Sequence, residues 1–127
     1  MKKVLIIDDD PDIREVIKTI LEDKYELYEA GSREEGGTAL KECTPDLVVL
    51  DVMMERHDSG FEMAREIKSD AQLKHAKILM LTNVDNEMKM DFKGTAGDPD
   101  WLPVDDYIVK PITPSEFLPK VEKLLGN

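Results

Sequence analysis

Acidic residues follow two apolar segments of strand length, and they are the residues of this chain most able to do chemistry. Asp51 ends an apolar run at residues 47–50, and Asp8 and Asp9 follow another at residues 4–7. Continuous apolar runs of this length are typical of strands that are buried on both faces in a parallel sheet covered by helices. The carboxyl ends of parallel strands lie at the same edge of a sheet, and ligands bind there. We therefore expect the three carboxylates to meet at one edge of a sheet.

Two further strand-like segments also end in polar residues, Thr82 and Lys110. Five strand-like segments alternate with five helix-like segments along the chain. The predicted strands are residues 4–7, 25–29, 46–51, 76–82 and 104–109, and the predicted helices begin after the caps Asp10, Ser32 and Thr113 and near Phe61 and Asn83. This alternation predicts an α/β fold, a doubly wound five-stranded parallel sheet with helices on both faces. Periodicity alone does not fix the strand order.

Three of the helix starts carry capping residues. Asp10 precedes a proline, which favours Asp10 as a helix cap rather than as a metal ligand. Ser32 with Glu35, and Thr113 with Glu116, have the spacing of a capping box, in which side chain and backbone at positions N-cap and N3 bond each other.

Composition and charge restrict the class of protein. The net charge of −11 disfavours direct binding to nucleic acid or to an anionic membrane. No apolar run is long enough for a signal peptide or a membrane span, and Cys43 is the single cysteine, which suits a reducing compartment. We expect one domain, residues 1–127, in the cytoplasm, with no attached output domain.

The convergent carboxylates indicate a metal site. Three carboxylates held close together raise one another's pKa, so a cation is expected among them, and Mg²⁺ binds through a few carboxylates plus water. An aspartate beside Mg²⁺, a lysine and a hydroxyl group can attack phosphorus and hold the resulting acyl phosphate. Asp51 would be that aspartate, Lys110 would neutralise phosphoryl oxygens, and Thr82 would donate a hydrogen bond to one of them.

Four motifs together identify a resemblance to a known family. They are VLIIDDDP at residues 4–11, PDLVVLDVMM at 45–54, ILMLT at 78–82 and DDYIVKP at 105–111. In this order they span nearly the whole chain, and the chain resembles the receiver domain of bacterial two-component response regulators. The resemblance implies a flavodoxin-like sheet of order 2-1-3-4-5. It also implies that Asp51 accepts a phosphoryl group from a phosphohistidine on a sensor histidine kinase or a phosphotransfer protein.

The same resemblance implies a metal-binding set. Asp9 would bind Mg²⁺ directly, Asp8 through water, and the backbone carbonyl of Met53 would be the remaining protein ligand beside Asp51.

It also implies a switch. Thr82 would move toward the phosphoryl group and Tyr107 would follow it, so that the face formed by the fourth helix, the last strand and the last helix changes shape for a downstream partner. Lys110 would contact the phosphate, and the bond between Lys110 and Pro111 would be cis.

The chain departs from the family pattern in three places. The loop 54–60 lacks the usual proline and is one residue longer, and Asn83 stands where a small residue is usual. We expect Asn83 to narrow access to Asp51. The segment 90–103, which contains Trp101, is longer than usual and predicts an unusual fourth helix or an added loop.

Two other functions remain open from the sequence. One is a pseudo-receiver, a constitutive protein-binding module that is never phosphorylated; the intact acids, Thr82 and Lys110 disfavour it. The other is a Mg²⁺-dependent phosphatase with an aspartyl-phosphate intermediate. That function needs a second acid near Asp51, but Met53 occupies the position two residues on, and the chain has no segment for a cap domain. We therefore expect a signalling phosphoacceptor rather than an enzyme that turns over an external substrate.

Overall fold

The computed structural model describes residues 1–51, 59–82 and 104–126. The strands are β1 (Lys3–Ile7), β2 (Glu26–Ala30), β3 (Leu47–Asp51), β4 (Lys77–Thr82) and β5 (Asp106–Val109). The helices are α1 (Pro11–Leu21), α2 (Arg33–Cys43), α3 (Ser59–Ser69) and α6 (Pro114–Leu125). The helix predicted from residue 83 lies outside the described residues. No helix in the described part of the chain combines the length and the apolar character that a membrane span needs.

The five strands form one parallel sheet in the order β2-β1-β3-β4-β5. This confirms the predicted fold class and strand order, and it places β2 at an edge. The strand predicted at 25–29 begins one residue later, because the amide of Tyr25 instead donates to the carbonyl of Leu21 and closes the end of α1.

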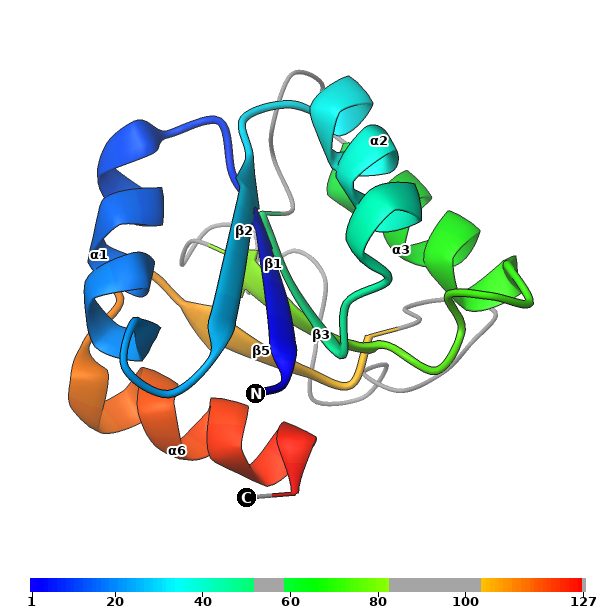
Figure 1. Ribbon diagram of the computed structural model, residues 1–127. Helices are drawn as coiled ribbons and strands as arrows, with labels where there is room; N and C mark the ends of the chain where they lie inside the picture. Colours follow the sequence, from blue (N-terminus) through cyan, green and yellow to red (C-terminus); the bar gives the residue numbers. More distant parts are fainter. Residues whose placement is uncertain (52–58, 83–103, 127) are drawn as a thin grey trace.

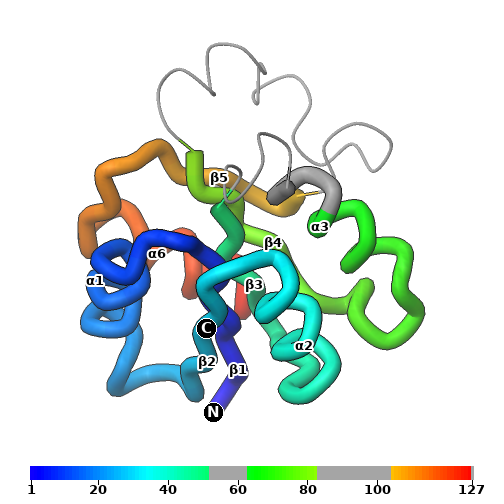
Figure 2. The backbone as a smooth tube through the Cα atoms, turned by 90° about the horizontal axis from the view of Figure 1, so that it is seen from above, coloured from blue at the N-terminus to red at the C-terminus, as the bar shows by residue number. Residues whose placement is uncertain are grey.

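Helices cover both faces of the sheet (Figure 1, and from above in Figure 2). Successive side chains of a strand point to opposite faces, and the buried residues separate accordingly into two clusters. Leu5, Val48 and Ile78 pack with residues of α2 and α3. Val4, Val49 and Leu79 pack with residues of α1 and α6. The central strands are therefore apolar at every position because both of their faces are covered.

The register of the sheet brings the strand ends to one level. Ile7 of β1 pairs with Leu50 of β3, so Asp8, the first residue after β1, lies beside Asp51, the last residue of β3. Asp51 pairs with Leu81 of β4. Thr82 follows at once and pairs with Val109 in β5, which places Lys110 at the same edge.

Two of the three predicted helix caps are confirmed. The side chain of Asp10 accepts a hydrogen bond from the amide of Asp12, and that of Ser32 accepts one from the amide of Glu35. The prediction for Thr113 is wrong in one respect. Thr113 is the N-cap residue of α6, but its side chain makes no capping bond, because its hydroxyl lies 3.4 Å from that of Ser115 and the amide of Glu116 bonds the Thr113 carbonyl instead.

Candidate functional site

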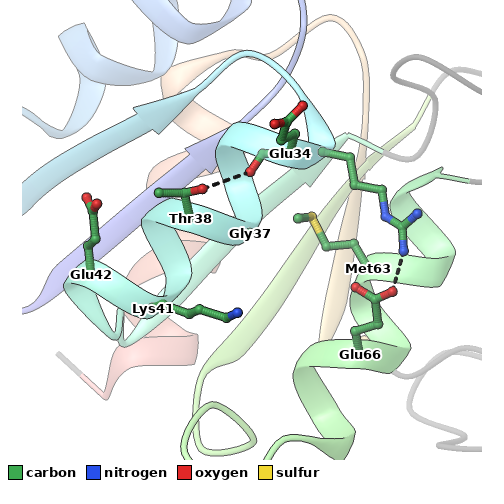
Figure 3. A pocket seen from close by; sticks show the side chains of 8 residues that line it. Glu34, Gly37, Thr38, Lys41, Glu42, Met63 and Glu66 are labelled. Atoms are coloured by element: carbon green, nitrogen blue, oxygen red, sulfur yellow. Dashed lines mark hydrogen bonds and ion pairs between the residues drawn. The ribbon is translucent and has the colours of Figure 1, made fainter.

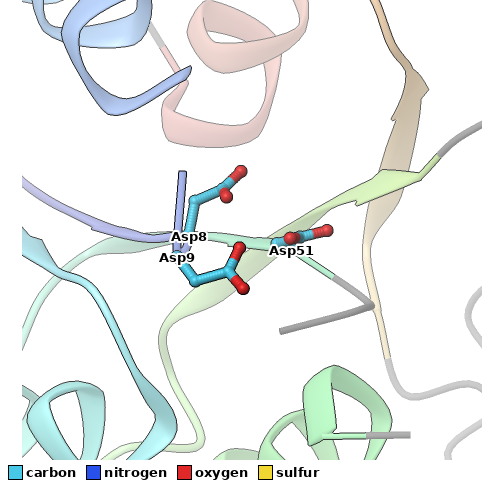
Figure 4. Close-up of side chains that lie close together, drawn as sticks. All are labelled: Asp8, Asp9 and Asp51. Atoms are coloured by element: carbon cyan, nitrogen blue, oxygen red, sulfur yellow. The ribbon is translucent and has the colours of Figure 1, made fainter. Parts of the chain in front are cut away.

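Three carboxylates meet at the carboxyl edge of the sheet (Figure 4). Oxygen atoms of Asp8, Asp9 and Asp51 all lie within 4.8 Å of one another. Asp8 and Asp51 are buried, with 0% and 4% of their surface exposed, whereas Asp9 is exposed. The convergence predicted from the strand ends is therefore present, and the cluster opens to solvent through Asp9.

Burial makes the charge of Asp8 electrostatically costly. Its Oδ1 accepts a hydrogen bond of 2.9 Å from the amide of Asp10, but its buried Oδ2 accepts no hydrogen bond from the residues that the structure describes. Burial raises the pKa of Asp8 above its ordinary value, although the Asp10 amide and the charge of Lys110 lower it in part. A buried carboxylate oxygen that accepts no hydrogen bond is costly, so a cation close to this atom is favourable.

Lys110 supplies one positive charge to the cluster. Its Nζ lies 3.5 Å from Oδ2 of Asp8 and 3.5 Å from Oδ1 of Asp51. The backbone amide of Lys110 donates to the carbonyl of Thr82 at 2.7 Å, which fixes the start of its side chain at the end of β5. The peptide bond between Lys110 and Pro111 is cis, the conformation that the resemblance implies.

The predicted switch residues lie on the same face of the sheet. Thr82 is buried and is two residues beyond Met80, which faces α2 and α3. Tyr107 is half-buried and packs against that same cluster. Nζ of Lys120, on α6, lies 5.8 Å from the centroid of the Tyr107 ring and 3.1 Å from Oδ1 of Asp106. Lys120 was not among the residues singled out from the sequence.

Arg14 was also not predicted from the sequence. It extends from α1 to the turn that carries the first acids, where its Nη1 donates to the backbone carbonyl of Asp8 at 2.6 Å. In the sequence it resembles any basic residue on a polar helix face. Its position in the helix could have indicated the contact. Arg14 lies one helical turn after the cap Asp10, whose carbonyl accepts from the Arg14 amide. Long helical side chains point toward the helix N-terminus, which here adjoins the end of β1.

Several predicted features fall on residues outside the described part of the chain. These are the carbonyl of Met53, residues 54–58 of the predicted loop, Asn83, and the segment 90–103 with Trp101, and they stay predictions. The last two residues predicted for the loop, Ser59 and Gly60, instead begin α3, so this helix starts two residues before the predicted Phe61.

A cavity of about 670 Å³ lies between α2 and α3 (Figure 3), and Asp8, Asp9 and Asp51 are not among the residues that line it. The lining of that cavity mixes acidic and basic side chains around Met63, and it includes an ion pair between Arg33 and Glu66. This cavity is therefore not a substrate pocket for Asp51.

The donors at the sheet edge fit a hard divalent cation. All three side chains offer carboxylate oxygens, and one of those oxygens is buried without a hydrogen-bond partner. Oxygen donors of this kind suit Mg²⁺. Among the described residues the cluster contains neither cysteine nor histidine, which zinc sites usually use.

A family model decides the identity of the chain. The model described as "Response regulator receiver domain" matches residues 4–122. The chain belongs to the response regulator receiver family. The resemblance seen in the four motifs is thereby confirmed.

Curated relatives agree with this assignment. The receiver is 34% identical over 125 residues to the phosphate regulon transcriptional regulatory protein PhoB of Pseudomonas aeruginosa, covering 98% of this chain and 52% of that protein. It is 36% identical over 124 residues to the transcriptional regulatory protein ResD of Bacillus subtilis, covering 97% of this chain and 48% of that protein. The receiver thus spans about half the length of these relatives.

Solved structures show the same fold. The chemotaxis response regulator CheY4 of Vibrio cholerae matches with a TM-score of 0.80 and 29% identity, over 98% of this chain and 99% of that chain. The receiver domain of NtrX from Brucella abortus matches with a TM-score of 0.80 and 27% identity, over 98% of each chain.

Proposed function

We propose that this receiver is the phosphoacceptor of a two-component or phosphorelay system, with Asp51 as the residue that is phosphorylated. The observation that carries the proposal is the position of the Asp51 carboxylate. It lies within 4.8 Å of two other acids that could hold a cation, and Lys110 Nζ lies 3.5 Å from its Oδ1. A site with both features can bring a carboxylate nucleophile to a phosphoryl group and offset the negative charge that the two share.

Asp9, Asp51 and the backbone carbonyl of Met53 would hold Mg²⁺ directly and Asp8 would hold it through water, and the bound ion would supply positive charge to phosphoryl oxygens. The chain's own residues then have separate roles. A carboxylate oxygen of Asp51 attacks phosphorus, a new O–P bond forms, and the N–P bond to the donor phosphohistidine breaks. The electron pair of that bond leaves with the imidazole, which takes up a proton from water.

Lys110 and Thr82 act on the transferred group. The ammonium of Lys110 can pair with a phosphoryl oxygen in place of its present ion pairs with Asp8 and Asp51. The Thr82 hydroxyl can donate to another phosphoryl oxygen. Tyr107, which shares the sheet face of Thr82, would then take a new position, so that phosphorylation biases an existing equilibrium between two shapes.

The partners follow from this role. A sensor histidine kinase or phosphotransfer protein would supply the phosphoryl group, and a downstream protein would recognise the switched face. We place the receiver in the cytoplasm, where such kinases present their phosphohistidine. The chain would be a signalling phosphoacceptor that catalyses its own phosphorylation and dephosphorylation and no other turnover.

Acetyl phosphate with Mg²⁺ tests the proposal directly. We expect intact-protein mass spectrometry to show one added phosphoryl group on the wild-type chain, none on Asp51→Asn, and normal labelling of Asp10→Asn. Asp10→Asn is a matched control, because asparagine caps a helix as well as aspartate does. A beryllofluoride titration with Mg²⁺, followed by NMR, should saturate. A wild-type chain that shows neither labelling nor a saturable shift would be a pseudo-receiver.

A further inference from the structure

Arg14 joins three parts of the molecule through one guanidinium group. Its Nη1 donates to the backbone carbonyl oxygen of Asp8 at 2.6 Å, and its Nε donates to Oε1 of Glu29 on β2 at 2.9 Å. The side chain is only 18% exposed. An arginine can make these two bonds at once because its donors form a rigid planar fork.

The bond to the Asp8 carbonyl bears on the next residue, Asp9. A peptide unit is planar, so the direction of the Asp8 carbonyl also sets the direction of the Asp9 amide and of the bond to the Asp9 Cα. The amide of Asp8 is already held by the carbonyl of Ala30 at 3.1 Å. Arg14 therefore fixes the second half of the turn, the half from which the Asp9 carboxylate extends.

The guanidinium occupies a confined space between Glu29 and Gly31. Glu29 binds Lys18 through its other carboxylate oxygen, with Lys18 Nζ 2.7 Å from Oε2, so the bond to Lys18 is separate from the bond to Arg14. On the other side, a Cβ atom added to Gly31 would lie 3.0 Å from Arg14 Nη1 and 3.7 Å from Glu35 Oε2. The glycine thus leaves the room that the arginine occupies.

We propose that Arg14 is a positioning residue that holds the Asp8–Asp9 turn in the geometry needed to bind a divalent cation. The inference rests on the proposed function, in which Asp9 and its neighbours bind Mg²⁺, and it adds a residue that touches none of the reacting groups. Arg14 acts through the backbone, and its contribution is the orientation of Asp9.

The sign of the effect separates positioning from simple charge. Arg14 is a cation close to an acidic cluster, so its charge alone repels Mg²⁺, and its removal would strengthen metal binding if electrostatics dominated. Loss of positioning would weaken binding instead. Groups that orient metal ligands typically contribute about 10- to 100-fold in metal affinity, which exceeds the effect of one partly screened charge.

The test is a Mg²⁺ titration of the unphosphorylated chain by isothermal titration calorimetry, with the amide resonance of Asp9 followed by NMR. We expect Arg14→Ala to weaken Mg²⁺ about tenfold and to shift the Asp9 amide before metal is added. Arg14→Lys keeps the charge but not the fork, so it should also bind weakly. Lys18→Ala is the matched control, since it removes a bond to the same Glu29 from the same helix without contacting Asp8, and it should bind as the wild type does.

Three results would overturn the inference: unchanged or tighter binding in Arg14→Ala, full affinity in Arg14→Lys, or an equal loss in Lys18→Ala. Thermal unfolding shows which variants are folded at the titration temperature. If Arg14→Ala is unfolded there, the Mg²⁺ affinity of Arg14→Lys decides the test. Labelling by acetyl phosphate is measured separately. If the wild type binds Mg²⁺ but is not labelled at Asp51, the proposed function is contradicted, and the titrations still test the role of Arg14. If the wild type binds no Mg²⁺, the proposed function and the role of Arg14 are both contradicted.

Discussion

The Nζ atom of Lys110 lies 3.5 Å from Oδ1 of Asp51, although β4 separates the two strands that carry them. The lysine reaches across the end of β4 and is also 3.5 Å from Oδ2 of Asp8. One ammonium group therefore serves two buried carboxylates. A phosphoryl group on Asp51 would have to draw Lys110 away from at least one of them, which links the charge of the cluster to the state of Asp51.

Replacing Lys110 separates metal binding from phosphoryl transfer. Lys110→Ala removes a cation that competes with Mg²⁺, so Mg²⁺ affinity should stay the same or rise. The rate of labelling by acetyl phosphate should fall about 100-fold, as when one donor to a developing oxyanion is lost. Rates are measured by quenched-flow mass spectrometry. Lys77→Ala, an exposed lysine at the opposite end of β4, is the control and should leave both quantities unchanged; a labelling rate retained in Lys110→Ala contradicts the assigned role.

Asp8 should destabilise the metal-free fold at neutral pH. Burial raises its pKa in the folded chain, so the folded state holds the proton more tightly than the unfolded state does. Stability is then unaffected below the ordinary pKa of aspartate and falls as pH rises through the interval between the ordinary and the raised value. We expect metal-free Asp8→Asn to melt at a higher temperature than the wild type at pH 7.

The gap between Asp8→Asn and the wild type should close as the pH is lowered toward 4. An asparagine at this position can still accept from the Asp10 amide, so the comparison isolates the charge. Saturating Mg²⁺ should raise the melting temperature of the wild type more than that of Asp8→Asn. Calorimetric scans from pH 4 to pH 8 provide the measurement. Equal melting temperatures of the two chains across that range would show that the charge of Asp8 does not destabilise the fold.

The sequence predicts the acidic edge of the sheet well, for a physical reason. The apolar runs immediately before Asp8 and before Asp51 mark where a buried strand must end, because a charged group cannot continue into the covered sheet. Parallel strands then bring those ends together regardless of the loops between them. The convergence of Asp8, Asp9 and Asp51 follows from these two facts.

Other features depend on contacts that a linear pattern does not contain. Strand order came from the family resemblance, since periodicity is the same for any order of buried strands. The hydroxyl of Thr113 pairs with that of Ser115 rather than with a backbone amide, a choice between two nearby hydrogen-bond partners. The roles of Arg14 and Lys120 depend on which strand edge each helix packs against, so their residue types alone did not distinguish them from solvent-exposed basic residues.

The two glycines of α2 should respond in opposite ways to the same substitution. A glycine inside a helix weakens it relative to alanine, but only at Gly37 does the structure have room for the larger residue. A Cβ at Gly37 meets nothing within 4 Å, whereas one at Gly36 would lie 2.9 Å from side-chain atoms of Ile7 and Met63. Gly37→Ala should stabilise the chain by about 1 kcal/mol.

Gly36→Ala gains the same helix propensity but overpacks the core. It should therefore be less stable than Gly37→Ala by about 1–3 kcal/mol. Urea unfolding of both variants gives the difference, in which the shared propensity term cancels. Equal stabilisation by both would mean that the ends of the Ile7 and Met63 side chains rearrange without cost.

Lys120 connects α6 to the residue expected to report phosphorylation. Its ammonium is paired with Asp106 at 3.1 Å and faces the ring of Tyr107 at 5.8 Å. A contact between an ammonium group and an aromatic ring is worth about 0.5–1 kcal/mol at an exposed site. Lys120→Met keeps the aliphatic stem and removes the charge, so it should change the balance between the present position of Tyr107 and any other by about two- to fivefold.

This prediction separates the switch from the acidic site. Lys120→Met should leave Mg²⁺ affinity and labelling of Asp51 unchanged, because Lys120 contacts neither, while the Tyr107 ring resonances move toward those of the beryllofluoride-bound wild type. Lys123→Met alters an exposed lysine on the same helix and should leave the ring resonances in place. If both variants shift the ring equally, the effect belongs to the charge of α6 as a whole; if neither does, the contact with Lys120 does not hold Tyr107. Only a shift confined to Lys120→Met ties the position of Tyr107 to this one cation.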